Sequence, residues 1–169
     1  NISSKPDVDL VLTTKEVIDM IKETGIQLKQ LELESPDLPF GLGSGSANIY
    51  GVTGGVAEAV LRHCVPDKSK NAYRLIAELG QRGPDRIKEV TVPLGDTELK
   101  IAVVHGLARA KELIKNIEEG KAFYHLVEVM TCREGCVGGA GQPYGMLKEK
   151  RARASGLYDI DSNAISTTL

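Results

Sequence analysis

The chain has 169 residues, a formal net charge of −2 and a pI near 6.0. Aromatic residues make up 4% of it and tryptophan is absent, so neither its charge nor its aromatic content indicates a nucleic acid partner. Because no apolar run reaches 18 residues and no leader pattern is present, we expect neither a membrane span nor a signal peptide. The length fits a single domain, 1–169, and three cysteines suit a cytoplasmic protein better than a disulfide framework.

The first elements predict an α/β architecture. Residues 9–12 are Asp-Leu-Val-Leu, a short apolar run typical of a buried strand. A capping-box pattern from Thr13 to Glu16 follows, and it predicts a helix over residues 14–24 that ends at Gly25. A strand, a short turn and a helix in this order indicate α/β structure.

The next segment predicts irregular backbone and then a helix. Pro36 and Pro39 should break any regular element, and residues 41–55 are rich in glycine. A phosphate-binding loop is a possible interpretation, but the lysine and hydroxyl residue of that motif are missing. From Val52 onward we expect a helix with one apolar stripe, in which Cys64 serves as a small buried hydrophobic residue. The stripe consists of Val56, Ala59, Val60 and Cys64.

The second half of the chain predicts the main sheet. Residues 72–79 fit a short helix or an edge strand, and residues 87–93 with 99–104 fit a hairpin. The overall prediction is a mixed, mainly parallel sheet flanked by helices. Its strands should include residues 9–12, 99–104 and 124–129, and its covering helices residues 14–24 and 107–119. A basic amphipathic helix is expected over residues 146–158.

Two of the three cysteines, Cys132 and Cys136, lie three residues apart where an apolar run gives way to glycine-rich backbone. Thiolates suit iron-sulfur clusters, zinc and copper(I), and glycines let the chain turn so that two sulfurs can face one centre. The spacing alone also fits half of a zinc site, a disulfide or two inert thiols.

The residues around these cysteines resemble the third cysteine signature of the iron-only (FeFe) hydrogenase catalytic domain. The matching positions are Glu128, Met130, Cys132, Gly135, Cys136, Gly139, Gly141, Gln142 and Pro143. The chain departs from the usual pattern at Thr131, at Arg133-Glu134 and at Ala140, so the surroundings of a cluster here should be atypical.

A second segment, residues 50–62, resembles a motif of the same hydrogenases. In that family an aromatic-glycine pair packs beside the diiron half of the active-site cluster, a role that the resemblance gives to Tyr50 and Gly51. Tyrosine replaces the usual phenylalanine, and its hydroxyl would need a partner. Ordinary packing is the alternative interpretation of Tyr50.

The resemblance implies a 4Fe-4S cubane joined to a diiron subcluster. It further implies that Cys132 binds only the cubane, that Cys136 bridges the two parts and that Met130 packs against them without coordinating. A cubane ordinarily takes four thiolates, and the two earlier cysteine signatures of the family do not occur in this chain. We therefore expect the C-terminal part of the catalytic domain, one lobe of two, inactive alone and without a catalytic residue of its own.

The implied activity of the parent protein is the interconversion of dihydrogen with protons and electrons. Its implied partner is a ferredoxin-like or NAD(P)-linked electron-transfer protein. The alternative is a non-catalytic relative, either an iron-sulfur assembly protein or a sensory hydrogenase homologue. Thr53 to Val56 and Gly139 to Pro143 favour the enzyme, whereas the three departures from the signature keep the alternative open.

Overall fold

The structure is a computed structural model that describes residues 6–32, 34–35, 37, 43–79, 82 and 87–164. Pro36, Pro39 and the first two residues of the glycine-rich stretch lie outside these ranges. The chain divides into two compact units, residues 1–37 with 140–144 and residues 38–139 with 145–169. The expected single domain stays a prediction. No helix in the described ranges is long and apolar enough to cross a membrane.

The first unit contains helix α1 (Thr14–Glu23) and the short 3-10 turn η1 (Leu28–Gln30). The predicted capping box is present, because the Thr13 hydroxyl accepts from the Glu16 amide at 3.2 Å while the Glu16 carboxylate accepts from the Thr13 amide at 2.7 Å. Gly25, with a φ of 73°, follows the end of the helix as expected.

The predicted strand at residues 9–12 is wrong. These residues form no strand, and the side chains of Leu10 and Val11 are 72% and 81% exposed. An apolar run becomes a buried strand only where neighbouring strands accept its backbone hydrogen bonds. The described part of this unit contains no strand that could do so.

The second unit is built on a three-stranded sheet of β1 (Ile87–Leu94), β2 (Thr97–His105) and β3 (Leu126–Met130), in that order. Strands β1 and β2 pair antiparallel as the predicted hairpin, and β2 and β3 pair parallel. The mixed α/β class is therefore confirmed. In these described strands one of the two pairings is parallel, so the sheet is not mainly parallel.

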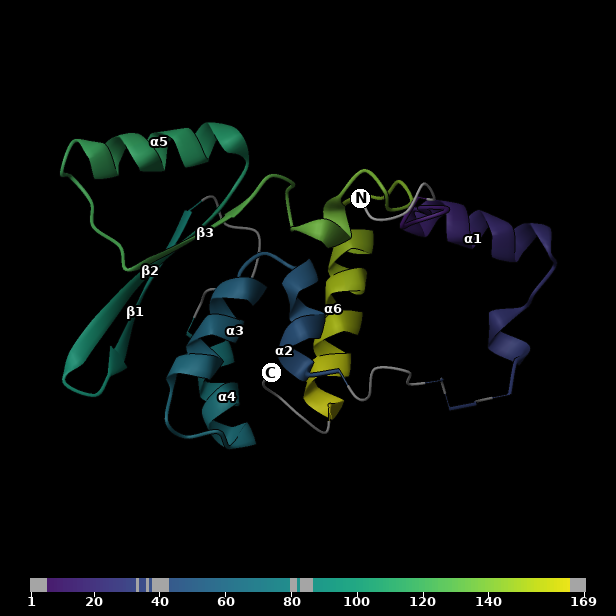
Figure 1. Cartoon of the computed structure of the whole chain (residues 1–169), viewed down its shortest axis with the longest axis horizontal. Helices are drawn as coiled ribbons and strands as arrows, with labels where there is room; N and C mark the ends of the chain where they lie inside the picture. Colours follow the sequence, from purple (N-terminus) through teal and green to yellow (C-terminus); the bar gives the residue numbers. More distant parts are fainter. Residues whose placement is uncertain are drawn as a thin grey trace. The chain divides into compact units, whose positions relative to one another are not determined.

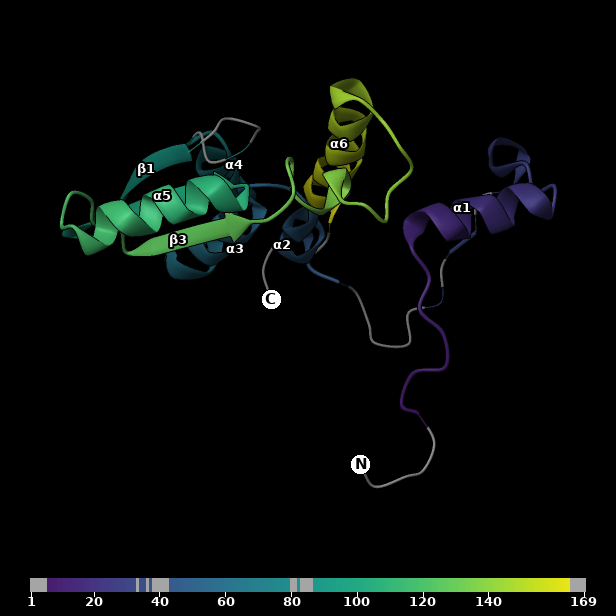
Figure 2. The ribbon, with the colours of Figure 1, turned by 90° about the horizontal axis from the view of Figure 1, so that it is seen from above.

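Helices cover both faces of the sheet (Figures 1 and 2). On one face α5 (Leu107–Glu118) packs Ala110 and Leu113 against alternate residues of β2. On the other face lie α3 (Gly55–Cys64) and α4 (Lys70–Ala77). This second core consists of Ala57, Leu61, Tyr73, Ile76, Val90, Val92, Ile101 and Val103. The alternation along β2 is that of a central strand buried on both sides.

Helix α6 (Leu147–Asn163) packs beside α2 (Gly45–Asn48), the 3-10 turn η2 (Ile49–Gly51) and the 3-10 turn η3 (Cys136–Gly138). It is longer than the basic helix predicted over residues 146–158. Its contacts form a third apolar cluster around Ile49, Val52 and Val137. This cluster joins the glycine-rich stretch to the cysteine loop.

The buried face of α3 differs from the predicted stripe. Cys64 is exposed and Val60 is 37% exposed, whereas Glu58 and Arg62 are fully buried. The apolar pattern predicts the wrong buried face for α3. Two of its buried positions carry charged side chains, Glu58 and Arg62, whose charges neutralise each other. The expectation that Cys64 is a buried hydrophobic residue is therefore wrong for this structure.

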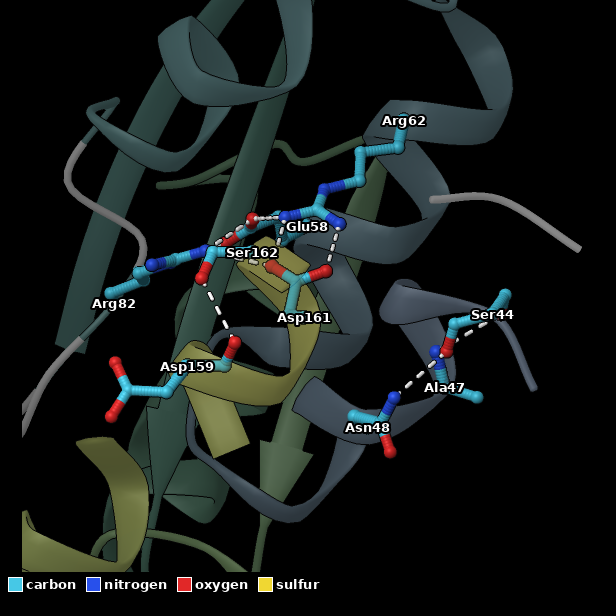
Figure 3. A network of polar contacts seen from close by, with 9 residues as sticks. All are labelled: Ser44, Ala47, Asn48, Glu58, Arg62, Arg82, Asp159, Asp161 and Ser162. Carbon is cyan, nitrogen blue, oxygen red and sulfur yellow. Dashed lines mark hydrogen bonds and ion pairs between the residues drawn. The ribbon is translucent and has the colours of Figure 1, made fainter. Parts of the chain in front are cut away.

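The charges on α3 belong to a buried ion-pair network (Figure 3). The Arg62 guanidinium donates to both carboxylate oxygens of Asp161 at 2.6 and 2.7 Å and to Glu58 at 2.5 Å. Arg82 donates to both oxygens of Glu58 at 2.6 and 2.7 Å. Burial alone would lower the pKa of Arg62, but its contacts with Asp161 and Glu58 raise that pKa overall. The network ties α3 to the last turn of α6.

A second buried carboxylate connects the sheet to α3. Glu128, on β3, is 6% exposed and accepts hydrogen bonds from the backbone amides of Gly54 at 2.6 Å and Ala57 at 2.7 Å. These amides belong to the N-terminal turn of α3, where a negative group offsets the helix dipole. Burial raises the pKa of Glu128, and its hydrogen bonds to these amides reduce that shift without cancelling it.

We predict that Asp161→Asn lowers the free energy of unfolding by about 3 kcal/mol, because it leaves the buried Arg62 without its bidentate partner. Urea unfolding of the purified chain measures this change. Asp159→Asn, an exposed change of the same kind on the same helix, should leave stability within about 0.5 kcal/mol. Equal free energies of unfolding for the two variants would contradict the proposed contribution of the ion-pair network to stability.

Glu128 should also make stability depend on pH. A folded-state pKa above the unfolded value means that the folded chain holds this proton more tightly, so the contribution is present at low pH and is lost as pH rises through the folded pKa. The stability advantage of the unchanged chain over Glu128→Gln should therefore shrink as pH rises above 4.5, the ordinary pKa of a glutamate. Urea titrations of both chains at several pH values measure this difference in stability. A difference that grows with pH would refute the raised pKa of Glu128.

Candidate functional site

The cysteine signature starts at the end of the central parallel pairing. Met130 is the last residue of β3 and lies opposite His105 of β2, and its carbonyl accepts from the Gly106 amide at 2.7 Å. The chain then leaves the sheet and reaches Cys132 two residues later. The first cysteine therefore follows directly from a strand end that is fixed by backbone hydrogen bonds.

The loop between the cysteines is closed by local backbone bonds. The Gly135 amide donates to the Cys132 carbonyl at 3.2 Å, and the Gly139 amide donates to the Cys136 carbonyl at 3.0 Å. Both cysteines are free thiols and both are exposed. The loop therefore leaves both thiols accessible, and their role as a pair of metal ligands stays a prediction.

Two glycines allow this loop to pack against the rest of the unit. A Cβ atom at Gly138 would lie 2.1 Å from the Arg133 carbonyl oxygen, a distance at which no side chain fits. Gly135 has a φ of 81°, and a Cβ there would lie 2.9 Å from both the Gly51 carbonyl oxygen and the Thr53 amide. Only glycine meets both conditions without moving the backbone.

Glu134 occupies a backbone conformation that favours glycine. Its φ of 72° is positive, and it is the only described non-glycine residue with that property. Its carbonyl accepts from the Thr53 amide at 3.3 Å, which fixes the loop to the residues that precede α3. The departure at Arg133-Glu134 therefore has a structural consequence, since the chain holds a side chain where the backbone suits glycine.

The structure brings Gly51 to the cysteine loop, as the close approach of its carbonyl to Gly135 shows. Tyr50 lies in the same turn, η2, and its side chain is 40% exposed. The described contacts do not place the Tyr50 ring against either cysteine. A role for Tyr50, Gly51 and Met130 beside a cofactor stays a prediction.

Helix α6 supports the loop from behind. Val137 is buried against Leu157 and Tyr158, and an Nη of Arg153 donates to the Val137 carbonyl at 2.9 Å. This arginine belongs to the predicted basic face of the helix, so one of its charges has a structural partner. The other basic residues at this end are Lys148, Lys150 and Arg151.

A pocket of about 280 Å³ lies behind the loop, in the same unit. Thr53 and Glu134 line it, and each has a buried side-chain oxygen without a hydrogen-bond partner. The Arg133 Nε lies 3.9 Å from this Glu134 oxygen, an ion-pair distance that is too long for a hydrogen bond. Burial raises the pKa of Tyr158, which also lines the pocket, to about 12. The phenol therefore stays neutral at physiological pH.

The end of the signature belongs to the first unit. There the Gly141 carbonyl accepts from the Lys15 amide at 3.0 Å, and the Gln142 amide group donates to the Thr14 hydroxyl at 3.1 Å. Both contacts fall on the first turn of α1. The glycine and glutamine of the signature therefore serve to hold the start of this helix.

The donor set decides how much of a metal centre the chain can supply. Cys132 and Cys136 offer two thiolates, and the described residues contain no group of three or more histidine, cysteine or acidic side chains placed to hold a metal ion. Two exposed thiols on a tight, glycine-rich loop fit one side of an iron-sulfur cluster. They provide half of the four thiolates that a cubane ordinarily takes.

Sequence reasoning missed the acidic and basic residues that position the loop. Glu128 was noted only as a motif position, and the network of Glu58, Arg62, Arg82 and Asp161 was not predicted. One signal was present, since Glu58 and Arg62 have the i, i+4 spacing of a helical ion pair. The partner Asp161 lies 99 residues from Arg62, and no local pattern identifies such a pairing.

The sequence matches the family described as iron only hydrogenase large subunit, C-terminal domain, over residues 1–140. It is 40% identical to the NADP-reducing hydrogenase subunit HndD of Solidesulfovibrio fructosivorans over 96% of this chain and 28% of that protein. It is 42% identical to the periplasmic Fe hydrogenase large subunit of Nitratidesulfovibrio vulgaris over 92% of this chain and 38% of that protein.

The chain is also similar to an iron-sulfur assembly protein and to a hydrogenase of known structure. The cytosolic iron-sulfur assembly component 3 of Mus musculus is 35% identical over 80% of this chain and 29% of that protein. A solved structure of the FeFe-hydrogenase HydA1 from Chlamydomonas reinhardtii matches with a TM-score of 0.63 and 31% identity, over 95% of this chain and 48% of that one. The chain thus spans less than half the length of each of these proteins. It belongs to the family of the iron only hydrogenase large subunit, C-terminal domain.

Proposed function

We propose that the chain is part of an iron-only hydrogenase that interconverts dihydrogen with protons and electrons. The observation that carries the proposal is the pair of exposed thiols, Cys132 and Cys136, on a loop whose shape depends on Gly135 and Gly138. Membership of the hydrogenase family supports the same chemistry. The rest of the parent protein would supply the remaining cluster ligands.

In this proposal Cys132 and Cys136 would hold a 4Fe-4S cubane, and Cys136 would also be the ligand shared with a diiron subcluster. When bound, the diiron unit supplies the hydrogen chemistry and the cubane carries electrons. Met130 and the turn containing Tyr50 and Gly51 would exclude water from one side of the site.

The chain's own contribution is to hold the two sulfurs in place. Glu128 fixes the start of α3, the Thr53 amide binds the Glu134 carbonyl, and Arg153 binds the Val137 carbonyl. Each of these bonds acts on backbone within or beside the loop, so the positions of the thiols depend on groups that never touch a metal. Such a rigid support is what a site with fixed ligand geometry needs.

The proposed electron partner is a ferredoxin-like or NAD(P)-linked protein. One relative is named an NADP-reducing hydrogenase subunit, which supports a nicotinamide-linked partner. The basic end of α6, with Lys148, Lys150 and Arg151, adjoins the cysteine loop through the neighbouring Arg153. Together with Glu149 these residues leave the end of the helix with a net positive charge, which favours an acidic partner protein.

The second candidate is an iron-sulfur assembly protein or a sensory homologue. The similarity to the cytosolic iron-sulfur assembly component of mouse favours it, as does the departure from the usual loop at Arg133-Glu134. The hydrogenase proposal has wider support, because the similarity to hydrogenases extends over 92–96% of the chain and that to the assembly component over 80%. The sequence upstream of this chain in its gene discriminates between them through the remaining cysteine signatures.

Changing Cys136 to serine in the intact protein should remove the infrared bands of the diiron unit, because the bridging sulfur is lost. The measurement is infrared spectroscopy of anaerobically matured protein. Cys64→Ser is the matched control, since Cys64 is an exposed thiol on α3 outside the loop, and it should leave the bands unchanged. Normal diiron bands in Cys136→Ser would refute the assignment of this ligand.

The 169-residue chain alone should fold but hold no hydrogenase cluster, since its two loop thiolates would leave half of a cubane without protein ligands. The test is anaerobic production with hydrogenase maturation proteins, followed by circular dichroism, iron analysis and measurement of hydrogen evolution from a strong reductant. We expect a folded chain with little iron and no hydrogen. Stoichiometric iron with hydrogen production would overturn this prediction.

A further inference from the structure

Glu134 combines two costly features in the centre of the cysteine loop. Its backbone has a φ of 72°, a conformation that suits glycine, and its side chain is 8% exposed. One oxygen of its carboxylate is buried and makes no hydrogen bond. Glycine at this position would remove both costs. Residues that keep such strain in a folded chain are concentrated at functional sites.

Neither a ligand nor a structural contact accounts for the Glu134 side chain. Its unpaired oxygen has almost no accessible surface, so no molecule in the pocket behind the loop can reach it. The bond that fixes the loop to the Thr53 amide comes from the backbone carbonyl of Glu134, and it would form equally with glycine. The remaining property of the side chain is its charge, which acts without contact.

The position of this charge suits an effect on the two thiols. Glu134 lies two residues from Cys132 and two residues from Cys136, and its side chain is buried. Charges interact more strongly through a protein interior than through water. The Arg133 Nε lies 3.9 Å away, but the Arg133 side chain is 65% exposed, so solvent screens the opposing charge.

The charge of Glu134 also acts on a neighbouring helix. Tyr158 lines the same pocket from α6, and burial raises its pKa to about 12. Arg82 opposes this shift, whereas nearby carboxylates, among them that of Glu134, add to it because they repel a phenolate. The same repulsion would act on any negative charge that is added at the cysteine loop.

We propose that Glu134 lowers the reduction potential of the cluster that Cys132 and Cys136 would hold. The proposal rests on the proposed function, which assigns these thiols to a 4Fe-4S cubane. Reduction adds one electron to the cubane, and the buried negative charge of Glu134 opposes that addition. The net charge around an iron-sulfur cluster is among the factors that set its potential. A lower potential makes the reduced cubane a stronger electron donor.

The main test removes the charge in the intact, anaerobically matured protein. Glu134→Gln keeps the size of the side chain, so it should shift the equilibrium about tenfold towards the reduced cubane. This shift raises the midpoint potential by about 59 mV for a one-electron couple. A redox titration followed by electron paramagnetic resonance measures the midpoint. An unchanged midpoint in Glu134→Gln would overturn the proposal.

Two control variants show whether the effect belongs to the charge at this position. Glu134→Asp keeps a carboxylate in the loop and should keep the midpoint close to that of the unchanged protein. Glu112→Gln removes an exposed negative charge from α5, outside the loop, and should leave the midpoint unchanged. Equal shifts in Glu134→Gln and Glu112→Gln would indicate a general effect of net charge and would overturn the assignment to Glu134.

Glu134→Gly tests whether the side chain is a cost to folding. Glycine adopts the positive φ without a clash and removes the buried unpaired oxygen, so the 169-residue chain should unfold about 2–4 °C higher. In the matured protein this variant should raise the midpoint as Glu134→Gln does. A merely structural side chain would have the opposite effect on stability and none on the midpoint. A lower unfolding temperature, or an unchanged midpoint, would overturn the proposal.

The matured samples also separate this proposal from the proposed function. Infrared bands report the diiron unit, and electron paramagnetic resonance reports the cubane. A cubane without diiron bands would refute the hydrogenase function, while the midpoints of the variants would still decide the role of Glu134. Diiron bands with equal midpoints in the unchanged protein and in Glu134→Gln would overturn the role of Glu134 alone. The absence of both signals would refute both proposals.

Discussion

The contact on which the arrangement depends most is the one between the Glu128 carboxylate and the amides of Gly54 and Ala57. It joins the last part of β3 to the first turn of α3 across more than seventy residues of sequence. The chain that leaves β3 becomes the cysteine loop, and the chain that enters α3 carries Gly51 and Thr53. One buried side chain therefore brings together the two segments that form the candidate site.

Much of the fold was predictable because its causes are local. The capping box at Thr13, the hairpin of β1 and β2 and helix α5 each follow from a pattern within fewer than twenty residues. The cysteine loop was identified in the same way, through its spacing and its glycines. Even the turn before α3 gave a signal, because its residues matched a motif associated with the same loop.

The remaining features depend on partners that are distant in sequence. Residues 9–12 have the composition of a strand, but no described strand pairs with them. The helix stripe through Cys64 was apolar, yet the buried face of α3 carries Glu58 and Arg62, because Asp161 and Arg82 supply opposite charges there. Hydrophobic patterns predict burial on the assumption that charges stay in water, and a compensated network breaks that assumption.

The close packing at Gly138 affects how this chain, as part of the proposed parent hydrogenase, would appear in a screen of all single substitutions. Every side chain at that position collides with the Arg133 carbonyl oxygen, so every substitution displaces the two thiols together with the backbone between them. Such a screen would rank Gly138 with Cys132 and Cys136, although it has no side chain to offer to a metal. Intolerance to substitution would therefore outline the support of the site as well as its proposed ligands, and only the structure separates the two.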